Sequence, residues 1–192
     1  MSSDRGATRL IKESIRKSME GIESLDIDRI KSISAKLIEC LNNDGKIMLC
    51  GNGGSASQAQ HIAAELVCKF RMNRRAYAAI ALTTDTSIIT AQANDHHFDS
   101  IFERQIEAHG RKGDVLIGLS TSGKSRNVAK AMQKAKESGI FTVALIGNDR
   151  KSSLVKIADE VLFIESSDTP RIQEAHLLAG HIICDLVEKG SA

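Results

Sequence analysis

The chain has 192 residues, of which 42% are hydrophobic, so it is long and apolar enough for one domain with a substantial buried core. Its 26 basic and 24 acidic residues nearly cancel to a formal charge of +2, and we therefore expect no nucleic-acid partner. Residues 1–10 lack the apolar core of a signal peptide, and no run approaches the ~20 apolar residues of a membrane span, so we expect a cytoplasmic protein without a membrane partner.

Helical patterns occupy the start of the chain, over residues 7–22 and 27–43. In the second pattern, apolar residues recur from Ile30 to Leu41 at the three-to-four spacing of one helix face. We therefore predict an N-terminal pair of helices within residues 1–44.

From residue 45 onward, short β-branched or aliphatic runs alternate with helical stretches. The predicted strands are 46–50, 77–82, 114–119, 141–146 and 160–164. The predicted helices are 55–69, 85–108 with a break near Asn94, 125–138, 152–158 and a closing helix from Pro170 to Glu188. This alternation predicts an α/β fold with a five-stranded parallel sheet. Because no segment has the composition of a linker, we expect residues 1–192 to form one domain, with the α/β core at 45–192.

Four cysteines are spread along the chain without forming a Cys-x-x-Cys pair: Cys40, Cys50, Cys68 and Cys184. Their wide spacing argues against disulfides and against a thiolate metal site. Because all four lie in apolar patterns, we expect buried free thiols.

Two polar loops follow predicted strands, where ligands of open α/β sheets bind. The first loop, 51–57, reads Gly-Asn-Gly-Gly-Ser-Ala-Ser, and its glycines let the backbone turn tightly and present amides to an anion. The second loop, 120–125, reads Ser-Thr-Ser-Gly-Lys-Ser and also opens a helix. Neither is a Walker loop, and the first lacks the third glycine of a dinucleotide fingerprint. Helix capping explains either loop alone, but two of them predict a site for a small phosphorylated compound.

His61 and Glu65 lie one turn apart on the helix that follows the first loop. An imidazole and a carboxylate at this spacing can meet at one metal ion, although a plain surface contact is the commoner arrangement. The closing helix adds further polar candidates: Gln173, Glu174, His176 and His181. His181 lies in an apolar stretch, where a histidine is more often a core residue than a catalytic one. Gly180 beside it would let another element approach closely.

From about Lys46 to Glu188 the chain resembles the phosphoheptose isomerase family. The segments that carry the resemblance are 50–57 (CGNGGSAS), 59–61 (AQH), 63–66 (AAEL), 84–87 (TDTS), 94–95 (ND), 113–116 (GDVL), 120–123 (STSG) and 171–176 (RIQEAH). The resemblance implies a flavodoxin-like five-stranded parallel sheet flanked by helices, the SIS (sugar isomerase) domain. It also implies a homotetramer with active sites between subunits.

The resemblance also implies site residues. The implied substrate-binding positions are Asn52, Gly53, Gly54, Ser55, Glu65, Asn94, Asp95, Ser120, Thr121, Ser122, Ser125 and Gln173. The implied ligands of one Zn²⁺ per subunit are His61, Glu65, Gln173 and His181, and the implied acid/base pair is Glu65 and His181. The chain departs from the family pattern at Gln58, where an acidic residue is common, and at His96-His97, and neither departure touches these residues.

The implied activity converts sedoheptulose 7-phosphate to D-glycero-D-manno-heptose 7-phosphate, as the first step toward ADP- or GDP-heptose for lipopolysaccharide or other surface glycans. Such an aldose–ketose isomerisation moves a proton between two carbons through an enediol, while a second proton moves between the oxygens. We expect Glu65 and His181 to share these two tasks, in either order. The metal or Gln173 would polarise the carbonyl.

Three alternatives remain. A noncatalytic SIS protein that binds the DnaA replication initiator is similar overall, but that family lacks the glutamate and histidine that stand here as Glu65 and His181. A sugar-phosphate-sensing transcription regulator would need a DNA-binding module, whereas the residues before the first strand indicate two plain helices. An arabinose 5-phosphate isomerase usually carries an additional C-terminal regulatory region, which this sequence does not show.

Overall fold

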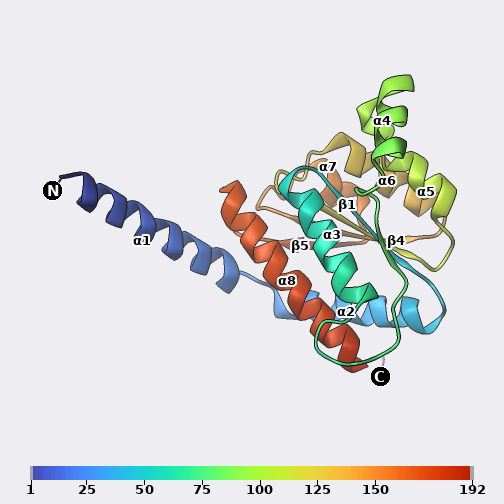
Figure 1. Cartoon of the computed structure of the whole chain (residues 1–192), viewed down its shortest axis with the longest axis horizontal. Helices are drawn as coiled ribbons and strands as arrows, with labels where there is room; N and C mark the ends of the chain where they lie inside the picture. Colours follow the sequence, from blue (N-terminus) through green and yellow to red (C-terminus); the bar gives the residue numbers. More distant parts are fainter. Residues whose placement is uncertain (1, 191–192) are drawn as a thin grey trace.

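Five parallel strands form one sheet in the order β2-β1-β3-β4-β5 (Figure 1). The computed structural model describes residues 2–190. The strands are β1 (Ile47–Gly51), β2 (Ala79–Ala81), β3 (Val115–Ser120), β4 (Phe141–Ile146) and β5 (Glu160–Phe163). This is the flavodoxin-like strand order, and each strand lies close to its predicted position.

Helices precede, connect and follow the strands. They are α1 (Ser2–Glu23), α2 (Ile27–Asn42), α3 (Gly54–Val67), α4 (Thr86–Asp95), α5 (Glu103–His109), α6 (Arg126–Glu137), α7 (Ser153–Ile157) and α8 (Thr169–Gly190). The predicted break near Asn94 is confirmed and is wider than a kink, because the short 3₁₀ helix η1 (Phe98–Ser100) separates α4 from α5.

The helices cover the sheet on both faces. Alternate strand residues point to opposite faces. Leu49 and Ile117 belong to the core under α2, α3 and α8, whereas Met48 and Leu116 belong to the core under α5, α6 and α7. The strands are therefore buried on both sides, which explains why they are nearly continuous apolar runs in the sequence.

α1 projects from the body of the molecule (Figure 1). Arg171 of α8 attaches it by donating hydrogen bonds to the carbonyl of Ser14, at 3.1 Å, and to Oγ of Ser18, at 2.7 Å. Large apolar side chains on α1 stay uncovered, each between 54% and 68% exposed: Leu10, Ile11, Ile15 and Met19. Among residues 2–190, no helix is both long enough and apolar enough to cross a membrane.

The prediction of four buried thiols is right for three cysteines and wrong for one. All four are free, and Cys40, Cys50 and Cys184 are buried. Cys68 is exposed, because it follows the last residue of α3, where the chain leaves the helix face that packs on the sheet.

Candidate functional site

The first polar loop turns directly from β1 into α3. Gly53 adopts a positive φ of 55°, which a side chain would oppose, and Ser55 returns a backbone hydrogen bond of 3.0 Å to the carbonyl of Asn52. α3 begins at Gly54 without a side-chain cap, and the backbone carbonyl of the capping residue Gly53 accepts hydrogen bonds from the amides of Ala56, at 3.0 Å, and Ser57, at 3.2 Å. Such a helix start favours an anionic ligand.

The second polar loop joins β3 to α6. Ser120 is buried, and its Oγ lies 2.8 Å from Oγ of Ser125. Thr121 is partly buried and Ser122 is exposed. Lys124 pairs with Asp149 at 2.7 Å, which directs its charge toward that residue. The loop therefore offers several neutral hydroxyl donors at one helix start.

The two loops are neighbours because β1 and β3 lie side by side at the centre of the sheet. β2 lies on one side of β1, and β3, β4 and β5 lie on the other side, so the strand order reverses between β1 and β3. The side-chain amides of Asn52 and Asn127 bond reciprocally, at 2.9 and 2.8 Å, and this pair joins the loops directly. Asn127 was not among the predicted site residues, because an asparagine in the first turn of a helix also fits ordinary capping.

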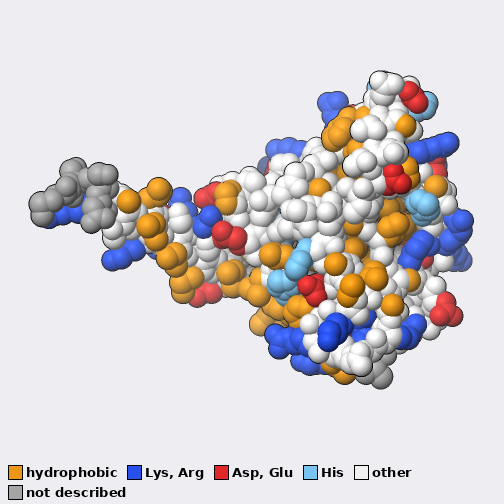
Figure 2. Space-filling view, viewed as in Figure 1, with side chains coloured by type: hydrophobic (Ala, Val, Ile, Leu, Met, Phe, Trp, Pro, Cys, Tyr) orange, Lys and Arg blue, Asp and Glu red, His pale blue; other side chains and the backbone are white. Residues whose placement is uncertain are grey.

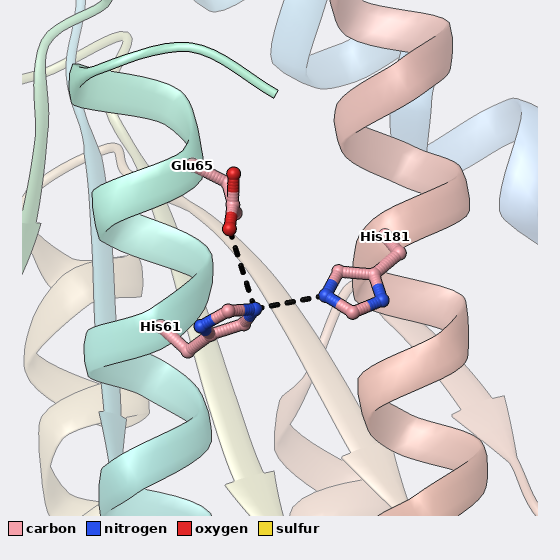
Figure 3. Close-up of side chains that lie close together, drawn as sticks. All are labelled: His61, Glu65 and His181. Carbon is pink, nitrogen blue, oxygen red and sulfur yellow. Dashed lines mark hydrogen bonds and ion pairs between the residues drawn. The ribbon is translucent and has the colours of Figure 1, made fainter. Parts of the chain in front are cut away.

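His61, Glu65 and His181 meet between α3 and α8 (Figure 3). Nε2 of His61 lies 2.8 Å from Nε2 of His181 and 3.4 Å from Oε1 of Glu65. Their ligand atoms all lie within 4.8 Å of one another. His61 is 45% exposed and Glu65 23% exposed at the side chain, so this cluster faces the surface of the single chain. Figure 2 shows histidine and acidic atoms among apolar ones on the surface over α3 and α8.

Close approach of α3 and α8 brings the cluster together. α3 and α8 lie side by side (Figure 1). A Cβ at Gly180 would lie 2.6 Å from Cδ1 of Ile62 and would displace that side chain, so glycine favours this close approach, as predicted. The side chain of Gln173 lies against Gly54 at the start of α3, and Gln58 donates a hydrogen bond to the backbone carbonyl of Gln173.

Other predicted residues lie apart from this cluster. Asn94 and Asp95 are exposed at the end of α4 and bond to each other at 2.8 Å, and among the described residues neither bonds to the two loops. Glu174 accepts a hydrogen bond from Ser18 of α1. His176 is fully buried, and burial lowers its pKa to about 4, which makes it a neutral core residue.

The donor set fits a divalent transition metal. Two imidazoles and one carboxylate match the three-ligand sets of catalytic zinc sites, which leave a position open for water or substrate. Ligands of a tetrahedral zinc lie about 3.3 Å apart, given bonds of about 2.0–2.1 Å. The 3.4 Å separation fits this value, and the 2.8 Å separation between the two imidazoles needs to widen by about 0.5 Å.

Known proteins confirm the class that the sheet and the loops define. A family model of the SIS domain matches residues 12–147. The phosphoheptose isomerase of Helicobacter pylori is 49% identical over 178 residues, which cover 93% of this chain and 90% of that protein. The solved phosphoheptose isomerase of Neisseria gonorrhoeae has a TM-score of 0.86 at 41% identity, over 98% of this chain and 100% of that one. That of Francisella tularensis has a TM-score of 0.90 at 33% identity, over the same shares.

The protein is thus an SIS-domain protein. More narrowly, the chain belongs to the phosphoheptose isomerase family.

Proposed function

We propose that the protein interconverts sedoheptulose 7-phosphate and D-glycero-D-manno-heptose 7-phosphate, in the cytoplasm, and supplies heptose for surface glycans. The observation that carries the proposal is the meeting of Glu65 and His181 on α3 and α8, with α3 beginning at the first of the two polar loops, in a chain of this family. No finding favours binding to the replication initiator.

The two loops are the proposed phosphate site. Ser55 and Ser120 are buried near the loop junction, and Ser122 and Ser125 add hydroxyls at the start of α6. His61 follows Gly54 by seven residues on α3, which places it about 10 Å farther along the helix axis. An extended seven-carbon sugar phosphate spans a comparable distance, so its phosphate can occupy the loops while its carbonyl end reaches the cluster.

His61, Glu65 and His181 are the proposed metal ligands, and zinc is the metal that this donor set suits best. Gln173 is the proposed fourth ligand, and its side chain, which lies against Gly54 in this structure, would have to turn toward the cluster to bind the metal. A bound zinc would act as a Lewis acid on the sugar carbonyl. The side-chain amide of Gln173 can donate a hydrogen bond to the same oxygen.

Glu65 is the proposed base at carbon and His181 the proposed proton carrier at oxygen. Glu65 removes the proton from one of the two adjacent carbons and returns it to the other. His181 gives a proton to the carbonyl oxygen as the enediol forms and takes one from the hydroxyl that becomes the new carbonyl. Their separation across two helices lets the two groups address different atoms of one substrate.

The test incubates the purified protein with sedoheptulose 7-phosphate, with and without zinc, and follows the aldoheptose phosphate by NMR. Glu65→Gln and His181→Gln should each lose at least about a hundredfold in kcat, within the range for acid/base residues. His109→Gln, at the end of α5, is the matched control and should keep full activity. A folded, zinc-loaded wild type that makes no product would overturn the proposal.

We also propose that copies of the chain associate into a homotetramer through α1. The exposed apolar residues of α1 lie on a helix that its own body does not cover, and a surface helix of this kind is typical of protein interfaces. The exposure of His61 agrees with a site that a second subunit helps to enclose. Ile15→Ser with Met19→Ser should reduce the mass measured by light scattering, whereas Lys17→Ser should not. An unchanged mass for the double variant would contradict this assignment of the interface.

A further inference from the structure

Glu188 is a buried carboxylate near the end of α8 that the proposed chemistry does not use. Its residue is 1% exposed. Oε1 accepts a hydrogen bond of 2.7 Å from the backbone amide of Phe70, and Oε2 accepts from the amides of Arg71, at 2.8 Å, and Met72, at 2.9 Å. One side chain of α8 therefore binds three consecutive amides of the segment that follows α3.

Arg74 ties the same segment to α3. Its side chain is 8% exposed, and its Nε lies 3.1 Å from Oε1 of Glu188. Its Nη2 donates a 2.9 Å hydrogen bond to the backbone carbonyl of Glu65. The guanidinium also lies 4.0 Å from the ring centre of Tyr77, which is buried. The end of the helix that carries Glu65 is thus connected through two side chains to the helix that carries His181.

Phe70 carries this connection to the cluster. Its ring stacks on the imidazole of His181, with centroids 5.4 Å apart and planes inclined by 26°. His61 meets the same imidazole edge-on, with centroids 5.1 Å apart and planes inclined by 69°. The orientation of His181 is therefore set on one side by Phe70, whose backbone Glu188 holds.

The charge of Glu188 strengthens this arrangement. Burial by itself raises the pKa of this carboxyl, but the three amides and Arg74 outweigh burial, so its pKa lies below the ordinary value. The group is a carboxylate at neutral pH and accepts charge-assisted hydrogen bonds, which are stronger than neutral ones.

We propose that residues 68–74 form a clasp between α3 and α8, in which Glu188 fixes the backbone and Phe70 fixes the ring plane of His181. Phe70 and Glu188 are positioning residues, because they act through His181. The inference rests on the proposed role of His181 and adds the device that orients it.

The first experiment distinguishes the effect of the aromatic face of Phe70 from the effect of its apolar volume. Phe70→Leu keeps most of the apolar volume and loses the stacking face, whereas Phe70→Tyr keeps the face. Phe70→Leu should weaken zinc binding to the metal-free protein about tenfold, as loss of a ligand-orienting neighbour does, and should lower kcat more than it changes KM. Phe70→Tyr should keep the zinc affinity and kcat of the wild type. Phe141→Leu, at the start of β4, is the control for losing an aromatic ring elsewhere.

The second experiment tests Glu188. Glu188→Gln keeps the shape but turns one acceptor into a donor that faces backbone amides. Hydrogen exchange of the amides of residues 70–72 should accelerate at least tenfold, and zinc affinity should fall with it. Glu160→Gln is the matched control, since Glu160 is also largely buried and accepts a 2.6 Å hydrogen bond from Ser32. If Glu188→Gln does not fold, the Phe70 pair still decides the question.

Zinc affinity and hydrogen exchange are measured without substrate, so they test the clasp even if the heptose reaction is not the right one. Equal zinc affinity in wild type and Phe70→Leu would overturn the proposal. Loss of affinity in Phe70→Tyr as large as in Phe70→Leu would overturn it as well, because the stacking face would then have no special role.

Discussion

Replacement of Gly54 by alanine should damage catalysis without damaging the fold. A Cβ at this position would lie 2.8 Å from both Cδ and Oε1 of Gln173, and closer still to Nε2. Van der Waals contact needs about 3.5 Å or more, so the carboxamide has to retreat by about 1 Å. A misplacement of that size can cost about a hundredfold in rate, which corresponds to about 2.7 kcal/mol of transition-state stabilisation. Stability should not fall, because the displaced atoms end a flexible side chain and alanine is favoured over glycine in a helix by up to about 1 kcal/mol.

The assay compares kcat/KM for sedoheptulose 7-phosphate with the free energy of unfolding in urea, for wild type and Gly54→Ala. Gly6→Ala is the control, since a Cβ at Gly6 meets nothing within 4 Å. The decisive comparison adds Gly54→Ala to a Gln173→Ala protein, where the second change should have no further effect on rate. A full additional hundredfold loss in that background would refute the reasoning, because the methyl group would then act on something other than Gln173.

Three further predictions follow from single contacts. Because burial lowers the pKa of His176 to about 4, the unfolded chain binds a proton before the folded one as pH falls below about 6.5, so the free energy of unfolding should fall by about 2 kcal/mol by pH 5. Urea titrations at pH 7 and pH 5 should show this loss in wild type and not in His176→Leu. Asn127→Ala should free the side chain of Asn52 and raise KM about tenfold, measured with saturating zinc. An unchanged KM would show that the amide pair does not hold the loops in their binding conformation. Chelation of the purified protein should abolish isomerisation and zinc should restore it, and activity that persists after verified metal removal would contradict the metal proposal.

The strands and most helices are predictable because each has its own periodic or continuous apolar signal. β2 is the shortest strand and was predicted too long, since as an edge strand it pairs with β1 alone and its ladder ends early. The region from α4 to α5 was predicted as one interrupted helix. Its apolar spacing is helical on both sides of η1, and nothing local in His96-His97 indicates how far the chain departs from the helix.

The site is predictable only where its residues are neighbours in the sequence. His61 and Glu65 are one turn apart, and the loops carry their glycines and hydroxyls in short runs. His61 and His181 are 120 residues apart in the sequence, so no local pattern predicts their contact. Composition alone favoured a buried His181. Glu188 and Asn127 gave no signal, because their roles depend on backbone amides and a side chain brought near by folding.

The geometry of the cluster bears on which residue removes and returns the carbon-bound proton. An imidazole that binds a metal through Nε2 keeps only Nδ1 for a proton, and Nε2 of His181 is the atom that faces His61. A carboxylate has two oxygens, and Figure 3 shows one oxygen of Glu65 directed at His61. Binding of the proposed metal would therefore leave Glu65 an oxygen that can still accept a proton, while it would take from His181 the nitrogen nearest the other ligands. This asymmetry supports Glu65 as the base at carbon and leaves to His181 the proton transfers at oxygen.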